Sequence, residues 1–216
     1  MKLGGENGPF GFNGGFTRIG SKIFDTMLLG LLWLLCALPL VTIGAANTAL
    51  YYAMVKSVKN DDGYPAEQFF KCFRQNFKQA TILWIIYAIL IFIAQLNCGI
   101  LMEKMSGTMG AVLIGFYVAV CVYLILMTLY TFPALSRFSM NTGWFIKLAL
   151  FMGVRYILTS LVFVIILGCA LGLIWRYPIA VFFAPGPVVF LLSEFMESIL
   201  ARHTPQDPSP AEEKQE

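Results

Sequence analysis

Five runs without a single charged side chain dominate this sequence of 216 residues. An α-helix rises about 1.5 Å per residue, so about 20 apolar residues cross the roughly 30 Å hydrocarbon core of a bilayer. Three of the five runs exceed that length, one matches it and the last is slightly shorter. We therefore predict a polytopic membrane protein. The charge-free runs cover residues 26–55, 79–102, 105–136, 156–175 and 177–193.

The composition indicates the same class of protein and selects helices. Hydrophobic residues make up 58% of the chain and charged residues 12%, whereas a soluble domain usually carries about 25% charged residues. A backbone in lipid must satisfy its own polar groups, so a span is a helix or part of a closed barrel. Barrel strands alternate apolar and polar side chains, but residues 161–175 are apolar without alternation. The prediction is an all-α helical bundle in a lipid bilayer.

Prolines break the first and last of these runs. Proline has no backbone N–H and disfavours helix at the residue before it. Pro39 therefore divides the first segment, and Pro185 and Pro187 divide the last. The bundle is predicted to have five to six membrane segments. These segments cover about 23–58 with its break at Pro39, 81–102, 110–132, 156–175 and 178–200.

The segments form one transmembrane domain over residues 23–200, with a tail on each side. The Gly-rich tail over residues 1–22 has too much glycine to hold a helix by itself. The polar tail over residues 201–216 is charged and rich in proline, so it is predicted to be disordered.

Amphipathic stretches connect some of the spans. Residues 64–80 carry phenylalanines at helical spacing, with basic and amide side chains on the other side. This pattern is typical of a helix that lies in the membrane surface, and a helix packed on a partner is the alternative. A second basic stretch within residues 133–155 follows another span, so the layout occurs twice and hints at internal duplication.

The basic residues indicate which loops are cytoplasmic, because such loops collect Lys and Arg. If the chain turns back at Pro39, 13 of the 15 basic residues lie inside and 2 outside. If the first segment crosses once, the split is 10 against 5. The first split favours the turn-back, although it needs two half-helices that are short for full crossings. Both arrangements place the C-terminus in the cytoplasm.

Polar residues accompany the broken helices. Non-helical backbone at membrane depth persists only inside the protein or beside a wet cavity. We therefore expect the two breaks to lie in the protein interior, close to each other. The alternative for the amides is plain packing between helices. The candidate structural or polar site comprises Pro39, Gly44, Asn47, Gln95, Asn97, Pro185 and Pro187.

The sequence offers little for catalysis. Catalytic and proton-coupled membrane proteins usually place ionisable groups at membrane depth, and none lies at the centre of a predicted span. The single histidine, His203, lies in the polar tail, and the five cysteines form no C-x-x-C pair. We expect no catalytic residues, no metal site and no cofactor, so the chain is not predicted to be an enzyme. The net charge of +3 is too small and scattered to indicate nucleic-acid binding.

Some larger side chains have ordinary interpretations. Tyr51, Tyr52 and Trp84 are expected to be anchors at the membrane interface. Glu194 could pair with Arg137 or Arg155, although a solvated charge at headgroup level is the simpler expectation.

Two blocks of sequence resemble a known family. The first contains L-P-x-x-T-I-G-A at residues 38–45, followed by Ala-Leu-Tyr-Tyr, and the second contains F-x-x-x-F-x-x-N-F-K-Q-A at residues 69–80. Both blocks are similar to the YesL-like family of bacterial membrane proteins of unknown function. The similarity covers mainly residues 16–100, and the family has no established catalytic or binding residues to transfer.

The resemblance implies a multi-pass protein of the plasma membrane of a Gram-positive-type bacterium. Relatives are often linked to carbohydrate uptake, so the expected role is an accessory component that contacts carbohydrate transporter subunits. The alternative is a small autonomous transporter or channel with a path lined by the broken helices.

Overall fold

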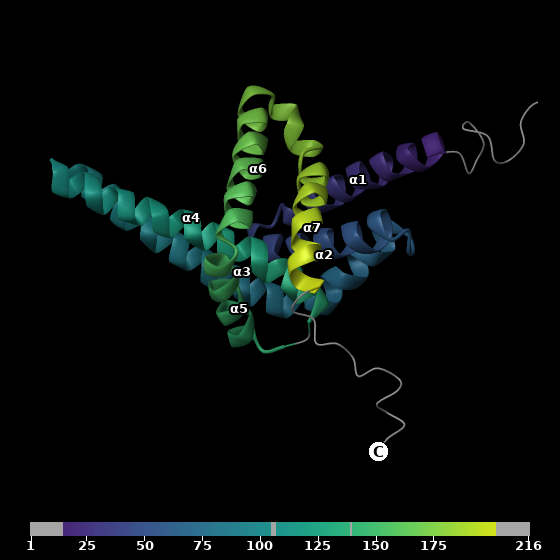
Figure 1. Ribbon diagram of the computed structural model, residues 1–216, viewed down its shortest axis with the longest axis horizontal. Coiled ribbons are helices and arrows are strands. Elements are labelled where there is room, and N and C mark those ends of the chain that lie inside the picture. Colours follow the sequence, from purple (N-terminus) through teal and green to yellow (C-terminus); the bar gives the residue numbers. More distant parts are fainter. Residues whose placement is uncertain (1–14, 105–106, 139, 202–216) are drawn as a thin grey trace, which may run out of the picture.

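The fold is all-α, as predicted, and no strand occurs among the described residues. The computed structural model describes residues 15–104, 107–138 and 140–201. Short 3-10 or π-helical turns, η1 (Leu40–Thr42), η2 (Met54–Lys59) and η3 (Pro178–Phe182), join some of the helices (Figure 1). The α-helices are α1 (Gly15–Ala37), α2 (Ile43–Ala53), α3 (Pro65–Lys104), α4 (Thr108–Arg137), α5 (Thr142–Arg155), α6 (Ile157–Arg176) and α7 (Pro185–Ala201).

Four of these helices are long and apolar enough to cross a membrane: α1 from Ile19, α3, α4 and α6. Only 11% of the most apolar window of each is buried inside the chain. Soluble proteins rarely expose so much apolar surface, so these helix faces are suited to contact with lipid. A membrane protein is thus the class that the helices indicate.

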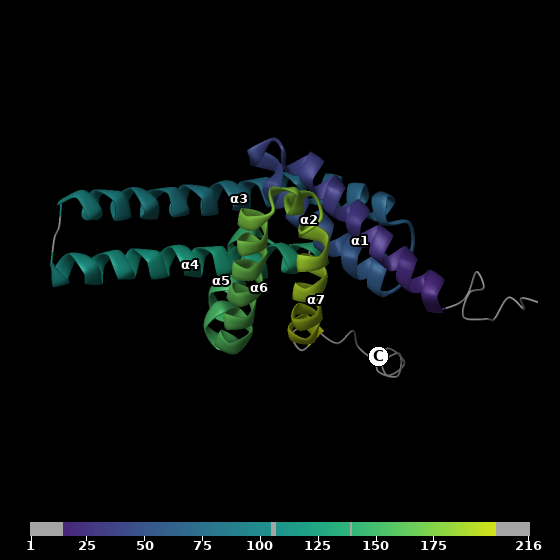
Figure 2. The same cartoon turned by 90° about the horizontal axis from the view of Figure 1, so that it is seen from above.

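The helices α3 and α4 form an antiparallel hairpin (Figure 2). At its base the Tyr87 hydroxyl lies 2.8 Å from the Thr131 hydroxyl, and both side chains are buried. Beyond this base the hairpin extends as an arm away from the other helices. Among residues 88–104 and 107–125, only Ala94 and Gly110 are buried.

The helices α1 and α2 pair in antiparallel fashion on either side of Pro39. The Trp33 Nε1 donates to the Asn47 Oδ1 over 2.7 Å, and the Thr26 hydroxyl lies 4.0 Å from the Met54 sulfur. Near the open end Lys22 forms an ion pair with Asp61 at 3.3 Å. The paired positions lie at nearly equal distances from residue 40, so the chain reverses there.

Helix α2 lies at the centre of the structure, where it contacts α1, α3, α4 and α7. Most of its residues are buried, and many are small, including Gly44, Ala45, Ala46, Ala49 and Ala53. Small side chains let neighbouring helices approach closely, which is the main source of helix association in lipid.

Three predicted boundaries differ from the structure, and the first is the N-terminal tail. Helix α1 begins at Gly15, so residues 15–22 of the predicted tail are helical. The dense glycine run ends at this point, and only Gly20 interrupts the following turns. Residues 1–14 and the tail after Ala201 lie outside the described residues.

The second difference concerns the amphipathic stretch 64–80. It forms one continuous helix of 40 residues with the span that follows, because no Gly or Pro occurs between residues 66 and 98. A rigid helix cannot lie flat in the membrane surface and then cross the membrane. Phe69 instead packs into the core beside α2 and is fully buried.

The third difference is the end of the span at 110–132. Helix α4 continues through Pro133 to Arg137. The flanking residues Phe132, Ala134 and Leu135 are all buried in the core. Their packing holds the helix although Pro133 cannot donate to the preceding turn.

Helix α2 depends on a close approach at Gly44, which yields a first prediction. A Cβ at this position would lie 2.6 Å from the Ala80 carbonyl oxygen and 2.7 Å from the Trp84 Cβ. We expect Gly44→Ala to lower the free energy of unfolding by about 1–3 kcal/mol, as overpacking does. Thermal unfolding of the purified chain in detergent measures this change.

The matched control is Gly99→Ala, because a Cβ at Gly99 on α3 meets nothing within 4 Å. Replacing an exposed helical glycine with alanine stabilises by up to about 1 kcal/mol. Equal melting temperatures for the two variants would show that the approach at Gly44 does not limit stability.

Candidate functional site

The polar backbone at the Pro39 turn is satisfied locally. The Thr42 N–H donates to the Pro39 carbonyl over 2.7 Å, and the Thr42 hydroxyl contacts the Cys36 carbonyl. From α3, the Trp84 Nε1 donates to the Leu40 carbonyl over 2.8 Å. Trp84, expected to be an interface anchor, therefore caps the turn.

Pro39 itself is exposed, together with its neighbours Leu38, Leu40 and Val41. The expectation that Pro39 lies in the protein interior was therefore wrong. The physical reason is that the Thr42 and Trp84 hydrogen bonds pair the freed carbonyls at the surface, so burial is not needed.

Two other residues of the predicted polar site lie inside the structure. Gly44 is buried between α3 and α4, close to Ala80 and to the Phe132 ring. Asn47 is half-buried on the wall of a cavity and accepts the Trp33 hydrogen bond.

Gln95 and Asn97 lie far from Gly44 and Asn47. Both lie on the projecting half of α3, where Gln95 is exposed and the Asn97 side-chain amide donates to the Ile93 carbonyl over 2.8 Å. Gln95 is 11 positions beyond Trp84, which corresponds to about 16 Å along the helix. The continuous course of α3 carries these amides away from the core.

The second pair of prolines lies at the start of α7. Pro185 lines the same cavity as Trp33 and Asn47, whereas Pro187 is exposed. Between them Gly186 packs against α1, where an added Cβ would lie 2.2 Å from the Thr26 carbonyl oxygen. The start of α7 therefore packs directly against α1, where Gly30 also lies close to Gly186.

The cavity has a volume of about 310 Å³ and lies between α2, α4, α6 and α7. Its walls are almost entirely aliphatic and aromatic. The few polar groups already have partners: the Asn47 Oδ1 accepts from Trp33, and the Thr128 hydroxyl donates to the Ile125 carbonyl over 2.6 Å. The apolar lining includes Leu50, Phe132, Phe163, Leu167, Ala170, Leu171, Ile174, Val188, Val189, Leu192 and Met196.

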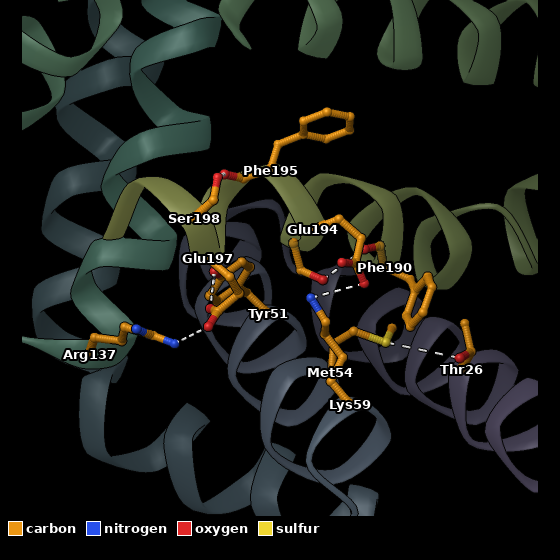
Figure 3. A network of polar contacts seen from close by, with 11 residues as sticks. Thr26, Tyr51, Met54, Lys59, Arg137, Phe190, Glu194, Phe195, Glu197 and Ser198 are labelled. Carbon is orange, nitrogen blue, oxygen red and sulfur yellow. Dashed lines mark hydrogen bonds and ion pairs between the residues drawn. The ribbon is translucent and has the colours of Figure 1, made fainter. Parts of the chain in front are cut away.

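A charged network lies next to Tyr51 and Met196 of the cavity wall (Figure 3). Glu197 on α7 accepts a hydrogen bond from the Tyr51 hydroxyl over 2.7 Å and forms an ion pair with Arg137 of α4. One turn earlier, Glu194 forms an ion pair with Lys59 of η2 at 3.0 Å. The network therefore joins the end of α7 to α2, η2 and α4.

The network corrects two expectations. Tyr51 is only 4% exposed and bonds to Glu197, so it is not an interface anchor. Glu194 pairs with Lys59, and Arg137 pairs with Glu197. Tyr51 and Glu197 are 146 positions apart, and no sequence spacing could have revealed their contact.

The network supplies a second prediction. Tyr51→Phe removes a buried hydroxyl that donates to a charged carboxylate, and such hydrogen bonds contribute about 1.5–3 kcal/mol. We expect the free energy of unfolding in detergent to fall by that amount. Tyr64→Phe is the control, because Tyr64 is 78% exposed and its change should stay within about 0.5 kcal/mol.

A double-mutant cycle identifies the mechanism. If Glu197→Gln is made in the Tyr51→Phe background, its own effect should shrink, because the shared hydrogen bond is already gone. Strictly additive effects would mean that Tyr51 and Glu197 act independently.

Comparison with known proteins identifies a match over part of the chain. Residues 26–98 match the model of a family described as a protein of unknown function, DUF624. The matched stretch contains about half of α1, the Pro39 turn, α2 and most of α3. No curated protein and no protein of solved structure matches the chain. The core of the fold thus carries the similarity to this family.

Proposed function

We propose that this chain is a non-enzymatic, multi-pass protein of the bacterial plasma membrane that acts as an accessory component of a carbohydrate uptake system. The YesL-like blocks at residues 38–45 and 69–80 support this role, and both fall inside the stretch that matches the family of unknown function. The four long apolar helices support its place in a membrane.

The cavity favours an accessory role over sugar binding by the chain itself. A sugar carries many hydroxyls, and a buried site rejects polar groups that it cannot pair. The cavity walls are apolar, and the Asn47, Thr128 and Tyr51 side chains already have hydrogen-bond partners. We therefore propose that a transporter subunit, and not this chain, binds the sugar.

The observation that carries the proposal is the projecting arm of α3 and α4. Its outer parts pack on each other and leave large apolar side chains exposed, such as Phe92 and Phe116, at 61% and 62%. On α4 the small residues Ala111, Gly115 and Ala119 are exposed at intervals of four, so they share one helix face. A face of this kind lets a helix of another membrane protein approach closely.

The antiparallel pairing of α1 and α2 supports the turn-back at Pro39. In this arrangement the N-terminus and the C-terminus are both cytoplasmic, and the segments cross six times. In the five-segment arrangement the first segment crosses once, so the N-terminus lies outside and the C-terminus stays cytoplasmic.

A small autonomous transporter is the second candidate. The position of the cavity, beside Pro185 and between α2, α4, α6 and α7, favours it. The apolar lining limits its cargo to molecules with few polar groups.

Capture of partners from native membranes tests the accessory role. We expect the tagged full chain to co-purify permease subunits of a carbohydrate transporter. Gly115→Leu should reduce this recovery strongly, because a large side chain would cover the face of small residues on α4 and keep a partner helix from approaching closely. A Cβ added at Gly115 meets nothing within 4 Å in the chain itself, so the fold should persist.

The matched control is Gly168→Leu on α6, which is also exposed and meets nothing within 4 Å. Its recovery of permease subunits should equal that of the unaltered chain. Absence of permease subunits from the unaltered sample would contradict the accessory role. Sugar uptake by liposomes that contain only this chain would favour the transporter instead.

A further inference from the structure

The cavity described above is elongated. On α7 its wall runs from Pro185 to Met196 along one helix face, and on α6 it runs from Phe163 to Ile174. At 1.5 Å per residue each of these faces is about 16 Å long. The cavity is therefore elongated along α6 and α7, with α2 and α4 forming the other walls, and it is open in part to the surroundings.

The lining selects an occupant that makes no hydrogen bonds. A buried water needs two to four polar partners, and on these walls the Asn47 Oδ1, the Thr128 hydroxyl and the Tyr51 hydroxyl are already engaged in hydrogen bonds. Hydrocarbon needs none, and it gains dispersion contacts with walls such as Leu167 and Val188.

The surroundings supply such hydrocarbon. The cavity lies against the middle of α6 and against α4, two of the helices that are apolar enough to cross a membrane. On the α6 part of the cavity wall, Leu171 is 67% exposed, so in a bilayer this side of α6 contacts acyl chains.

The charges near the cavity do not select a headgroup. Beyond Met196, Glu197 is paired with Arg137, and Glu194 is paired with Lys59. Since each carboxylate is matched by a basic side chain, the cavity mouth at this end has little net charge. Recognition therefore rests on the chain and not on headgroup charge.

We propose that the cavity between α6 and α7 is a binding site for one acyl chain of a membrane phospholipid. The lipid serves as a structural ligand that fills the space between α4, α6 and α7. This inference does not rest on the role in carbohydrate uptake.

Photolabelling tests the proposal. The full chain is reconstituted in phosphatidylcholine vesicles that contain a phosphatidylcholine with a diazirine in one acyl chain. We expect peptides of α6 and α7 that line the cavity, around Ala170 and Val188, to be labelled more strongly than exposed apolar positions such as Val164. Replacing half of the lipid with phosphatidylglycerol should leave this pattern unchanged.

Filled-cavity variants provide the decisive comparison. Ala170→Phe and, independently, Val188→Phe place a ring in the cavity and should abolish the excess labelling. Val164→Phe is the control, because Val164 is 38% exposed on the same helix α6, and its labelling pattern should match the unaltered chain. Circular dichroism and size-exclusion chromatography verify that each variant is folded.

Native mass spectrometry gives a second measurement. The unaltered chain and Val164→Phe should retain a phospholipid after mild delipidation, and the two filled variants should lose it. Equal labelling in filled and unaltered chains would overturn the proposal, as would a retained lipid that is not a phospholipid.

Discussion

The close packing of α2 against α3 and α4 is the constraint on which the rest of the structure depends. Lipid is as apolar as the side chains, so helices in a membrane associate by tight packing and not by the hydrophobic effect. Gly44 brings the α2 backbone to the Ala80 carbonyl, and Ala45 and Ala49 are fully buried one turn apart. This approach places Asn47 and Tyr51 on the cavity wall, so the geometry of the candidate site follows from the small residues of α2.

Polar groups are arranged so that few of them meet hydrocarbon alone. At the Pro39 turn, Thr42 and Trp84 pair the carbonyls that a continuous helix would have paired. At the other end, Glu197 is matched by Tyr51 and Arg137. An unpaired carboxylate at the edge of an apolar cavity would be costly. The second arrangement ties the end of α7 to α2 and α4.

The sequence predicted what depends on local pattern and missed what depends on distant contacts. The span expected over residues 156–175 is observed as α6, because the charge-free run itself makes that helix apolar. The partner of Glu197 could not be predicted, since its contacts with Tyr51 and Arg137 arise only after the helices pack. Gln95 and Asn97 were placed near Asn47 because amides at membrane depth suggest a common site, but the unbroken α3 separates them.

The cavity is a consequence of how α6 meets the rest of the molecule. Figures 1 and 2 show α6 crossing α4 steeply and α7 standing beside α6, while α3 and α4 run together. Where α6 crosses α4, the Tyr130 hydroxyl lies 2.9 Å from the Ser160 hydroxyl, and the Tyr130 and Phe163 ring centroids are 5.6 Å apart. Straight helices that cross steeply diverge on either side of such a contact, so α6 leaves α4 and opens a wedge towards Ile174. Side chains fill such wedges in soluble proteins to a density close to that of organic crystals. In a bilayer an acyl chain can do so instead, and the small Ala170 and Val188 side chains leave it room.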